Sequence, residues 1–205
     1  MTALYYILTI VSSYLIGSSN MSYYISRIKR VDFRADGSKN LGASNTVLLA
    51  GWRAGIAVGV HDILKGVLCV ILSQIFFSDL PYIGVLAGVS CVLGHIFPFY
   101  LKFKGGKGFA SYIGVAYGIN WKVALILTAI ILVIMLLSDY IVVATTLTVT
   151  LVPIVYGFTE RSYILPLILL VASMVIIIKH IENYKRMINK TEMRLSKIGK
   201  SKNKT

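Results

Sequence analysis

Val123–Leu137 reads Val-Ala-Leu-Ile-Leu-Thr-Ala-Ile-Ile-Leu-Val-Ile-Met-Leu-Leu and contains no charged residue. A second apolar run, Tyr140–Phe158, follows it almost at once. Runs that approach ~20 apolar residues are typical of helices that cross the ~30 Å hydrocarbon core of a membrane. The same pattern recurs along the chain on both sides of this pair, and we predict an all-α, multi-pass transmembrane helical bundle. The six apolar segments are Ala3–Tyr24, Ala54–Phe77, Tyr82–Tyr100, Val123–Leu137, Tyr140–Phe158 and Tyr163–Lys179.

The composition of the 205 residues agrees with a membrane protein. Hydrophobic residues make up 57% of the chain and the mean hydropathy is +0.77, whereas soluble domains are about 45–50% apolar. The charged residues are 21 Lys or Arg against 8 Asp or Glu, which gives a net charge of +13. Because the basic residues fall between and after the apolar segments, we expect anionic lipid headgroups or small anionic substrates as partners, and no nucleic acid.

The basic residues predict the orientation of the chain, since cytoplasmic loops of membrane proteins carry an excess of Lys and Arg. Three basic regions follow the first span, the third span and the last span, and the last of them carries nine Lys or Arg from Lys179 onward. We place all three in the cytoplasm and the nearly neutral links around Ser78 and Thr159 outside. The basic residues of the first two loops are Arg27, Lys29, Arg30, Arg34, Lys39 and Arg53, and then Lys102, Lys104 and Lys107.

This orientation fixes the parity of the spans. With the first loop inside, the N-terminus lies outside, and a cytoplasmic C-terminus requires an odd number of crossings. We therefore assign a seventh, short crossing to Gly108–Asn120, which at 1.5 Å per residue covers only ~20 Å and needs a thinned or protein-lined environment. A five-span arrangement keeps the parity but leaves two apolar segments un-inserted. Residues 1–196 are predicted to form one membrane-embedded domain, in the cell (inner or plasma) membrane, and residues 197–205 a basic tail.

Few ionisable residues fall inside the apolar segments. Asp62 and Lys65 share a helix face in the second segment, and we interpret them as a structural ion pair. Cys69 and Cys91 lie in apolar segments and are expected to be buried small hydrophobes without a disulfide. No cluster of His, Cys, Asp or Glu has ligand spacing, so no metal and no cofactor is expected.

Three polar stretches carry the candidate chemistry. Asp32–Asn45 is dense in Gly, Ser and Asn, which favours a polar binding site over a bland connector. Phe103–Phe109 reads Phe-Lys-Gly-Gly-Lys-Gly-Phe, and its successive glycines allow an anion-binding nest, although it lacks the spacing of a Walker A loop. After the last span, His180 and Asn183 would share a face if the helix continues, with the histidine as a proton acceptor. Together the stretches predict a site for an anionic, phosphorylated amphiphile at the cytoplasmic face.

Across nearly its whole length the sequence resembles the bacterial acyl-phosphate:glycerol-3-phosphate acyltransferases. The family motif GSGNxGATN is similar to Gly37-Ser-Lys-Asn-Leu-Gly-Ala-Ser-Asn45. Four further pieces occur in order and at the family's spacing. They are Asp62-Ile-Leu-Lys-Gly66, Gly94-His-Ile-Phe-Pro98, Phe103-Lys-Gly-Gly-Lys-Gly108, and His180-Ile-Glu-Asn183 with Arg186 and Glu192.

The resemblance implies a seven-span architecture with a cytoplasmic site, acyl phosphate and glycerol 3-phosphate as substrates, and lysophosphatidic acid and phosphate as products. A substrate phosphate oxygen is the alternative to His180 as proton acceptor. The oligomeric state stays open. The candidate catalytic residues are His180, Asn183 and Ser38, and the candidate substrate-binding residues are Arg34, Gly37, Asn40, Gly42, Asn45, Lys104, Gly105, Gly106, Lys107, Gly108, Thr145 and Arg186.

One departure from the family bears on activity. Three residues after the last Asn of the first motif the family has an Arg that contacts substrate phosphate, and this chain has Leu48. We hypothesise that Lys39 or Arg53 replaces the missing cation. Two other interpretations remain, a diverged or inactive paralogue and a lipid- or anion-handling membrane protein without chemistry.

Overall fold

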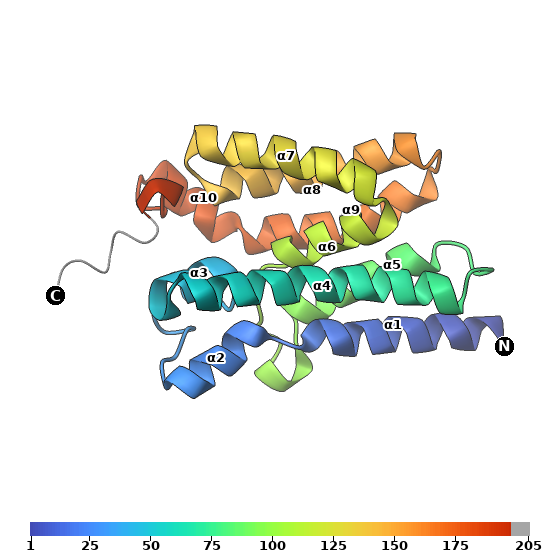
Figure 1. Cartoon of the computed structure of the whole chain (residues 1–205), viewed down its shortest axis with the longest axis horizontal. Coiled ribbons are helices and arrows are strands. Elements are labelled where there is room, and N and C mark those ends of the chain that lie inside the picture. Colours follow the sequence, from blue (N-terminus) through green and yellow to red (C-terminus); the bar gives the residue numbers. More distant parts are fainter. Residues whose placement is uncertain (198–205) are drawn as a thin grey trace.

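The computed structural model describes residues 1–197, and this part is all-helical, as predicted (Figure 1). The basic tail predicted at 197–205 lies outside the described residues from 198 onward. The elements are α1 Thr2–Ser18, α2 Met21–Lys29, α3 Ala43–Ala50, α4 Trp52–Phe76, α5 Ile83–Ile96, η1 Phe99–Leu101, α6 Phe109–Ile119, α7 Trp121–Ser138, α8 Ile141–Thr159, α9 Ile164–Lys179, α10 Ile181–Ile188 and η2 Leu195–Lys197.

The long helices form two layers that run along the same direction (Figure 1). In one layer α1 and α4 both pack against α5, and α6 packs on α4. In the other layer α8 packs between α7 and α9. Contacts of α5 with α9 and of α6 with α7 join the layers. The short helices α2, α3 and α10 gather at the end of the bundle opposite to Met1.

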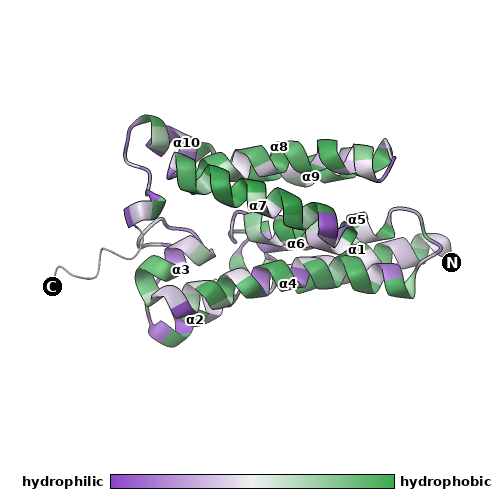
Figure 2. Ribbon diagram, turned by 45° about the horizontal axis from the view of Figure 1, so that its top comes forward, coloured by the Kyte–Doolittle hydropathy of each residue, from purple (hydrophilic) through white to green (hydrophobic). Residues whose placement is uncertain are grey.

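Hydrophobic residues predominate along the long helices, while α2 and α10, at the end of the bundle opposite to Met1, are more hydrophilic (Figure 2). Within residues 1–197, five stretches are long and apolar enough to cross a membrane, and the pair α9 and α10, bent by 45°, makes a sixth if it is counted as one span. The short apolar stretch that the parity argument singled out is helix α6, with 11 residues. Large side chains such as Leu137 and Phe158 are about four-fifths exposed. In a membrane these side chains would face lipid.

Glycines bring two pairs of helices into close contact. A Cβ added at Gly17 of α1 would lie 2.1 Å from the carbonyl oxygen of Cys91 in α5. Likewise, a Cβ at Gly114 of α6 would lie 2.1 Å from the carbonyl oxygen of Ile63 in α4. Small residues at such positions let backbones approach, which is how helices pack in the absence of a hydrophobic driving force. Cys69 and Cys91 are both free and buried, as expected.

The structure differs from the sequence-based expectation at three places. The first helix ends at Ser18 rather than near Tyr24, because the side chain of Asn20 caps a new helix, α2, by accepting a hydrogen bond from Tyr23 N–H at 2.9 Å. Helix α3 occupies part of what we predicted as loop. The last helix does not continue past Lys179, since the chain bends by 45° at His180 before α10 begins.

Candidate active site

A cavity of about 420 Å³ opens at the hydrophilic end of the bundle. It is lined by the first loop and the start of α3, the start of α6, the first turn of α8, and α10 with the residues after it. All three of the predicted polar stretches therefore meet in one cavity. Ten of the fifteen candidate residues line it, namely Gly37, Ser38, Asn40, Gly42, Lys107, Gly108, Thr145, His180, Asn183 and Arg186.

Asn45 has a structural role rather than the predicted substrate contact. Its side chain is fully buried, its Oδ1 accepts from the N–H of Ser38 at 2.7 Å, and its Nδ2 donates to carbonyl oxygens of the same loop, including Phe33 at 2.8 Å and Asn40 at 3.0 Å. These bonds hold Ser38 and Asn40 at the cavity wall. A Cβ at Gly37, where φ is +62°, would lie 2.2 Å from Asn45 Oδ1, so this turn needs glycine.

The glycines of the second loop also act through the backbone. The N–H groups of Gly105 and Gly106 donate to the carbonyl oxygens of Ile96 and His95 at 3.0 and 3.1 Å, so they do not form the predicted anion nest. Gly108, with φ +89°, begins α6 and lines the cavity. The first turns of α3 and α6 both border the cavity, and unpaired N–H groups at helix N-termini attract anions. An anion in the cavity would therefore lie near two helix N-termini.

Two predicted cations lie elsewhere. Lys104 is exposed and does not line the cavity, because the loop ties its two following glycines to the end of α5. Arg34 lies in a separate hollow beside α2, where its Nε is 3.7 Å from Asp32 Oδ1. Neither is placed to contact a molecule in the cavity.

A chain of polar contacts links the second and third stretches. Lys107 Nζ donates to Asn183 Oδ1, Asn183 Nδ2 donates to Glu192 Oε1 at 2.6 Å, and Arg186 Nε donates to Glu192 Oε2 at 2.7 Å. Burial, together with repulsion from Arg186, lowers the pKa of Lys107 to about 8, although Glu192 opposes the shift. Asn183 therefore connects two cations through a carboxylate, and the hydrogen bonds of its side chain go to Lys107 and Glu192 rather than to the His180 ring.

His180 is held instead by the end of its own helix. Its Nδ1 lies 2.8 Å from the carbonyl oxygen of Ile176. Because a carbonyl only accepts, Nδ1 carries the ring proton and the other ring nitrogen, Nε2, has the lone pair. Burial lowers the pKa of His180 to about 4 despite the hydrogen bond to Ile176, and the nearby Lys107 lowers it further. The ring is therefore a neutral hydrogen-bond acceptor at neutral pH.

Sequence reasoning missed the segment that follows α10. Thr191, Glu192 and Met193 line the cavity. The segment then reaches the corner between α7 and α8, where Ser196 N–H donates to Asp139 Oδ1 at 2.8 Å. Only the resemblance drew attention to Glu192, and no pattern in the sequence singled out Thr191 or Met193.

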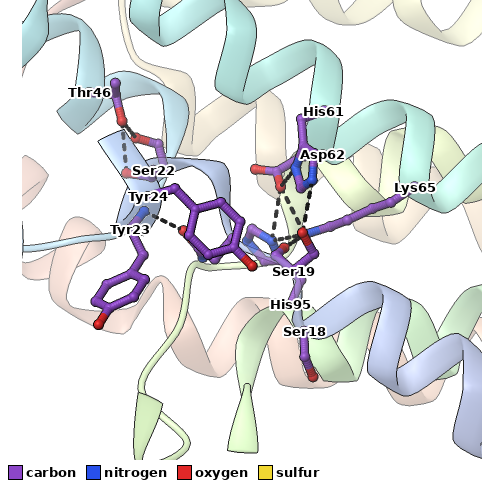
Figure 3. Close-up of polar contacts among 12 residues, drawn as sticks. Ser18, Ser19, Ser22, Tyr23, Tyr24, Thr46, His61, Asp62, Lys65 and His95 are labelled. Atoms are coloured by element: carbon purple, nitrogen blue, oxygen red, sulfur yellow. Dashed lines mark hydrogen bonds and ion pairs between the residues drawn. The ribbon is translucent and has the colours of Figure 1, made fainter. Parts of the chain in front are cut away.

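The cavity floor contains a buried ionic cluster (Figure 3). Asp62 and His95 line the cavity, and the predicted ion pair is confirmed, with Lys65 Nζ 2.8 Å from Asp62 Oδ1. Lys65 Nζ is also 2.8 Å from Ser19 O and 2.8 Å from His95 Nδ1. These three acceptors use all three protons of the ammonium, so the ring proton of His95 lies on Nε2.

The second loop packs directly against the ring of His95. A Cβ at Gly106 would lie 2.0 Å from His95 Nε2, which shows how closely the loop rests on this ring. We predicted the pairing of Asp62 with Lys65 from their spacing, but nothing in the spacing could place His95, 30 residues further on, in the same cluster.

At the position where the family has an Arg, the cavity wall is formed by an apolar side chain. Leu48 lines the cavity, whereas neither Lys39 nor Arg53 does. The structure thus lends no support to the hypothesis that one of these two residues replaces the Arg. Among the described residues that line the cavity, the Lys and Arg side chains are Lys107 and Arg186.

The comparison with protein families agrees with this geometry. Residues 7–190 match the family model described as glycerol-3-phosphate acyltransferase. The chain belongs to this family. A glycerol-3-phosphate acyltransferase 1 of Oceanobacillus iheyensis is 33% identical over 94% of this chain and 96% of the relative. A glycerol-3-phosphate acyltransferase of Mesorhizobium japonicum is 36% identical over 94% of this chain and 97% of the relative.

The architecture of this family member matches that of a solved relative. The crystal structure of PlsY, described as an integral membrane glycerol 3-phosphate acyltransferase, superposes in its glycerol 3-phosphate form with a TM-score of 0.90 at 28% identity, over 97% of this chain and 99% of PlsY. The lysophosphatidic acid form gives a TM-score of 0.84 at 28% identity, over 92% of this chain and 94% of PlsY. The fold is thus that of an integral membrane acyltransferase along nearly the whole chain.

Proposed function

We propose that this chain transfers a fatty acyl group from acyl phosphate to the 1-hydroxyl of glycerol 3-phosphate. The observation that carries the proposal is the meeting of Ser38, Lys107 and His180 around one cavity, in a chain whose fold matches PlsY in its glycerol 3-phosphate form. The hydroxyl oxygen bonds to the acyl carbon, the bond from that carbon to the phosphate oxygen breaks, and lysophosphatidic acid and inorganic phosphate result.

The charges of the cavity suit two anionic substrates. Acyl phosphate and glycerol 3-phosphate repel each other unless cations and N–H donors offset their charge. Lys107, Arg186 and the N-terminal turns of α3 and α6 supply this offset. Each helix N-terminus contributes roughly half a positive charge. The phosphate of acyl phosphate is already a good leaving group, so this proposal needs no serine or cysteine nucleophile.

The proton of the attacking hydroxyl could go to His180 or to a substrate phosphate oxygen, and the properties of His180 favour the phosphate oxygen. His180 Nε2 has the lone pair that can accept a hydrogen bond from the hydroxyl. A pKa of about 4 makes the ring a poor proton carrier at neutral pH, since a general base works best when its pKa is near the working pH. We therefore propose that His180 orients the hydroxyl and that an oxygen of the departing phosphate takes the proton.

We also propose that the chain crosses the cell membrane seven times and that the cavity faces the cytoplasm. The basic loops support this orientation, as do the opposite ends at which Met1 and α10 lie. Helix α6 would be the short crossing. It is lined by protein on the α4 and α7 sides, which is the environment that a short crossing needs.

An activity assay tests the proposed function. Purified protein in detergent is supplied with palmitoyl phosphate and glycerol 3-phosphate, and lysophosphatidic acid is quantified by mass spectrometry. We expect product in proportion to enzyme, and none when acyl-coenzyme A replaces acyl phosphate. His180→Ala should lower turnover at saturating substrate by ~10–100-fold, as expected for one lost transition-state hydrogen bond.

Two outcomes would contradict the proposal. Absence of product from folded wild-type protein would favour the interpretation that the apolar wall at Leu48 marks a diverged, inactive paralogue. Normal turnover of His180→Ala would exclude the histidine from orienting the attacking hydroxyl.

A further inference from the structure

A second hollow, separate from the cavity described above, lies beside α2 at the same end of the bundle. It has a volume of about 460 Å³, and its walls include Tyr23, Ser26, Arg27, Arg30, Asp32 and Arg34. It shares no lining residue with the candidate active site. We call it the arginine hollow.

The backbone of α2 gathers the arginines. Tyr23, Ser26, Arg27 and Arg30 are spaced at i, i+3, i+4 and i+7, so they share one face of the helix. Arg30 ends α2 in the left-handed conformation, with φ 56° and ψ 35°. The chain then turns back, with Val31 N–H donating to Ser26 O at 3.1 Å, and this turn brings Arg34 to the same hollow.

The charge of the hollow favours an anion. Its lining residues carry three guanidinium groups and one carboxylate, that of Asp32, which gives a net charge of +2. Asp32 also accepts from the N–H of Arg34 at 2.9 Å, so part of its hydrogen-bonding capacity serves the turn. Planar guanidinium groups bind phosphate oxygens in pairs, which suits several arginines around one phosphate better than lysines would.

The surroundings place the hollow at the level of lipid headgroups. The ring of Tyr23, on its wall, packs edge-on against Tyr100 at 6.0 Å between centroids, and Phe99 packs on Tyr100 at 5.5 Å. The exposed fractions of Tyr24, Phe99 and Tyr100 range from 39% to 53%. Exposed aromatic side chains beside long apolar helices are typical of the membrane–water interface. Basic pockets at this depth bind anionic headgroups.

We propose that the arginine hollow binds the phosphodiester headgroup of an anionic phospholipid from the surrounding leaflet. The ligand would lie outside the acyl-transfer cavity, with its phosphate between Arg27, Arg30 and Arg34 and its chains along the apolar flank of the bundle. Free phosphate has the same chemistry at the charged group, but it lacks the apolar part that the aromatic rim would contact.

The test compares lipid binding to variants of the full-length chain. Detergent-purified protein is titrated with phosphatidylglycerol, and native mass spectrometry gives the Kd of the first bound lipid. We expect Arg27→Gln and Arg30→Gln each to weaken binding about fivefold and the double variant about 30-fold, since one basic residue near an anionic lipid surface contributes ~1 kcal/mol. Because both arginines are exposed, both variants should keep the wild-type melting temperature.

The matched control is Lys29→Gln, which removes the same charge from α2 at a position that does not line the hollow. It should leave the Kd within about twofold, because the pocket itself is unchanged. Equal weakening by Lys29→Gln, or no weakening by either arginine variant, would overturn the proposal. So would equal affinity for phosphatidylcholine, or displacement of phosphatidylglycerol by millimolar inorganic phosphate, which would assign the hollow to the free ion.

Discussion

Lys107 connects two of the three polar stretches by a side-chain hydrogen bond. It extends from the second loop to Asn183 of α10, and through Glu192 it is coupled to Arg186. Its charge is sensitive to pH because burial and Arg186 lower its pKa to about 8. A lysine is cationic below its pKa, so its attraction for anionic substrates is fully present well below pH 8 and is lost progressively as the pH rises through about 8.

We therefore expect kcat/KM for glycerol 3-phosphate to fall as the pH rises through about 8. Lys107→Arg should remove this fall, because guanidinium stays protonated throughout the range. Lys107→Ala should lower kcat/KM by ~10–100-fold, the cost of one charge-assisted hydrogen bond. Lys104→Ala, the control in the same loop, should leave the value almost unchanged. If kcat/KM of Lys107→Arg still fell as the pH rose through about 8, another group would be responsible for the pH dependence.

At the residue scale the sequence predicted positions better than roles. Gly, Ser, Asn and His in the loops are conspicuous in an otherwise apolar chain, and ten of the fifteen candidate residues do line one cavity. Their tasks depend on contacts that no spacing shows. Asn45 bonds to backbone groups of its own loop, and the amides of Gly105 and Gly106 are used by the end of α5. Met193 lines the cavity without any local signal in the sequence.

At the scale of elements, the contact of α4 with α6 sets the position of the second loop. Gly114→Ala would place a methyl group against a backbone carbonyl, which cannot move as a side chain can. We expect this change to lower the free energy of unfolding by ~1–3 kcal/mol. Thermal unfolding in detergent, followed by circular dichroism, measures the loss.

Gly59→Ala is the matched control for this helix contact. Its Cβ would meet only the Cβ of Ala43, at an ordinary distance of 3.8 Å. Removing a helical glycine there should be neutral or slightly stabilising. A Gly114→Ala protein that unfolds at the same temperature as Gly59→Ala would contradict the close approach of α4 and α6.

The long helices could be predicted because their apolar segments are longer than the apolar segments of soluble domains. Parity directed attention to Gly108–Asn120, and the structure has α6 there. Helix α3 and the bend at His180 were missed for a physical reason. Helix α3 has little hydrophobic periodicity, and it is stabilised by contacts with α4 that lie outside its own sequence.

At the scale of the whole molecule, the seven-span proposal fixes the side on which each loop lies. Asp79 and Arg161 should be extracellular, and Lys39 and Lys104 cytoplasmic. Single cysteines at these positions can be tested with a membrane-impermeant maleimide, and the background is low because Cys69 and Cys91 are buried. In intact cells we expect labelling at positions 79 and 161 alone. Labelling at 39 or 104 in intact cells would reverse the orientation.

The central claim is that residues 37–45, 104–108 and 180–183 form one site for glycerol 3-phosphate. An experimental structure of the protein with this substrate tests it most directly. We expect the phosphate within hydrogen-bonding distance, ~3 Å, of Lys107 Nζ and the 1-hydroxyl beside His180 Nε2. Density for the substrate only in the arginine hollow, or away from both residues, would contradict the claim.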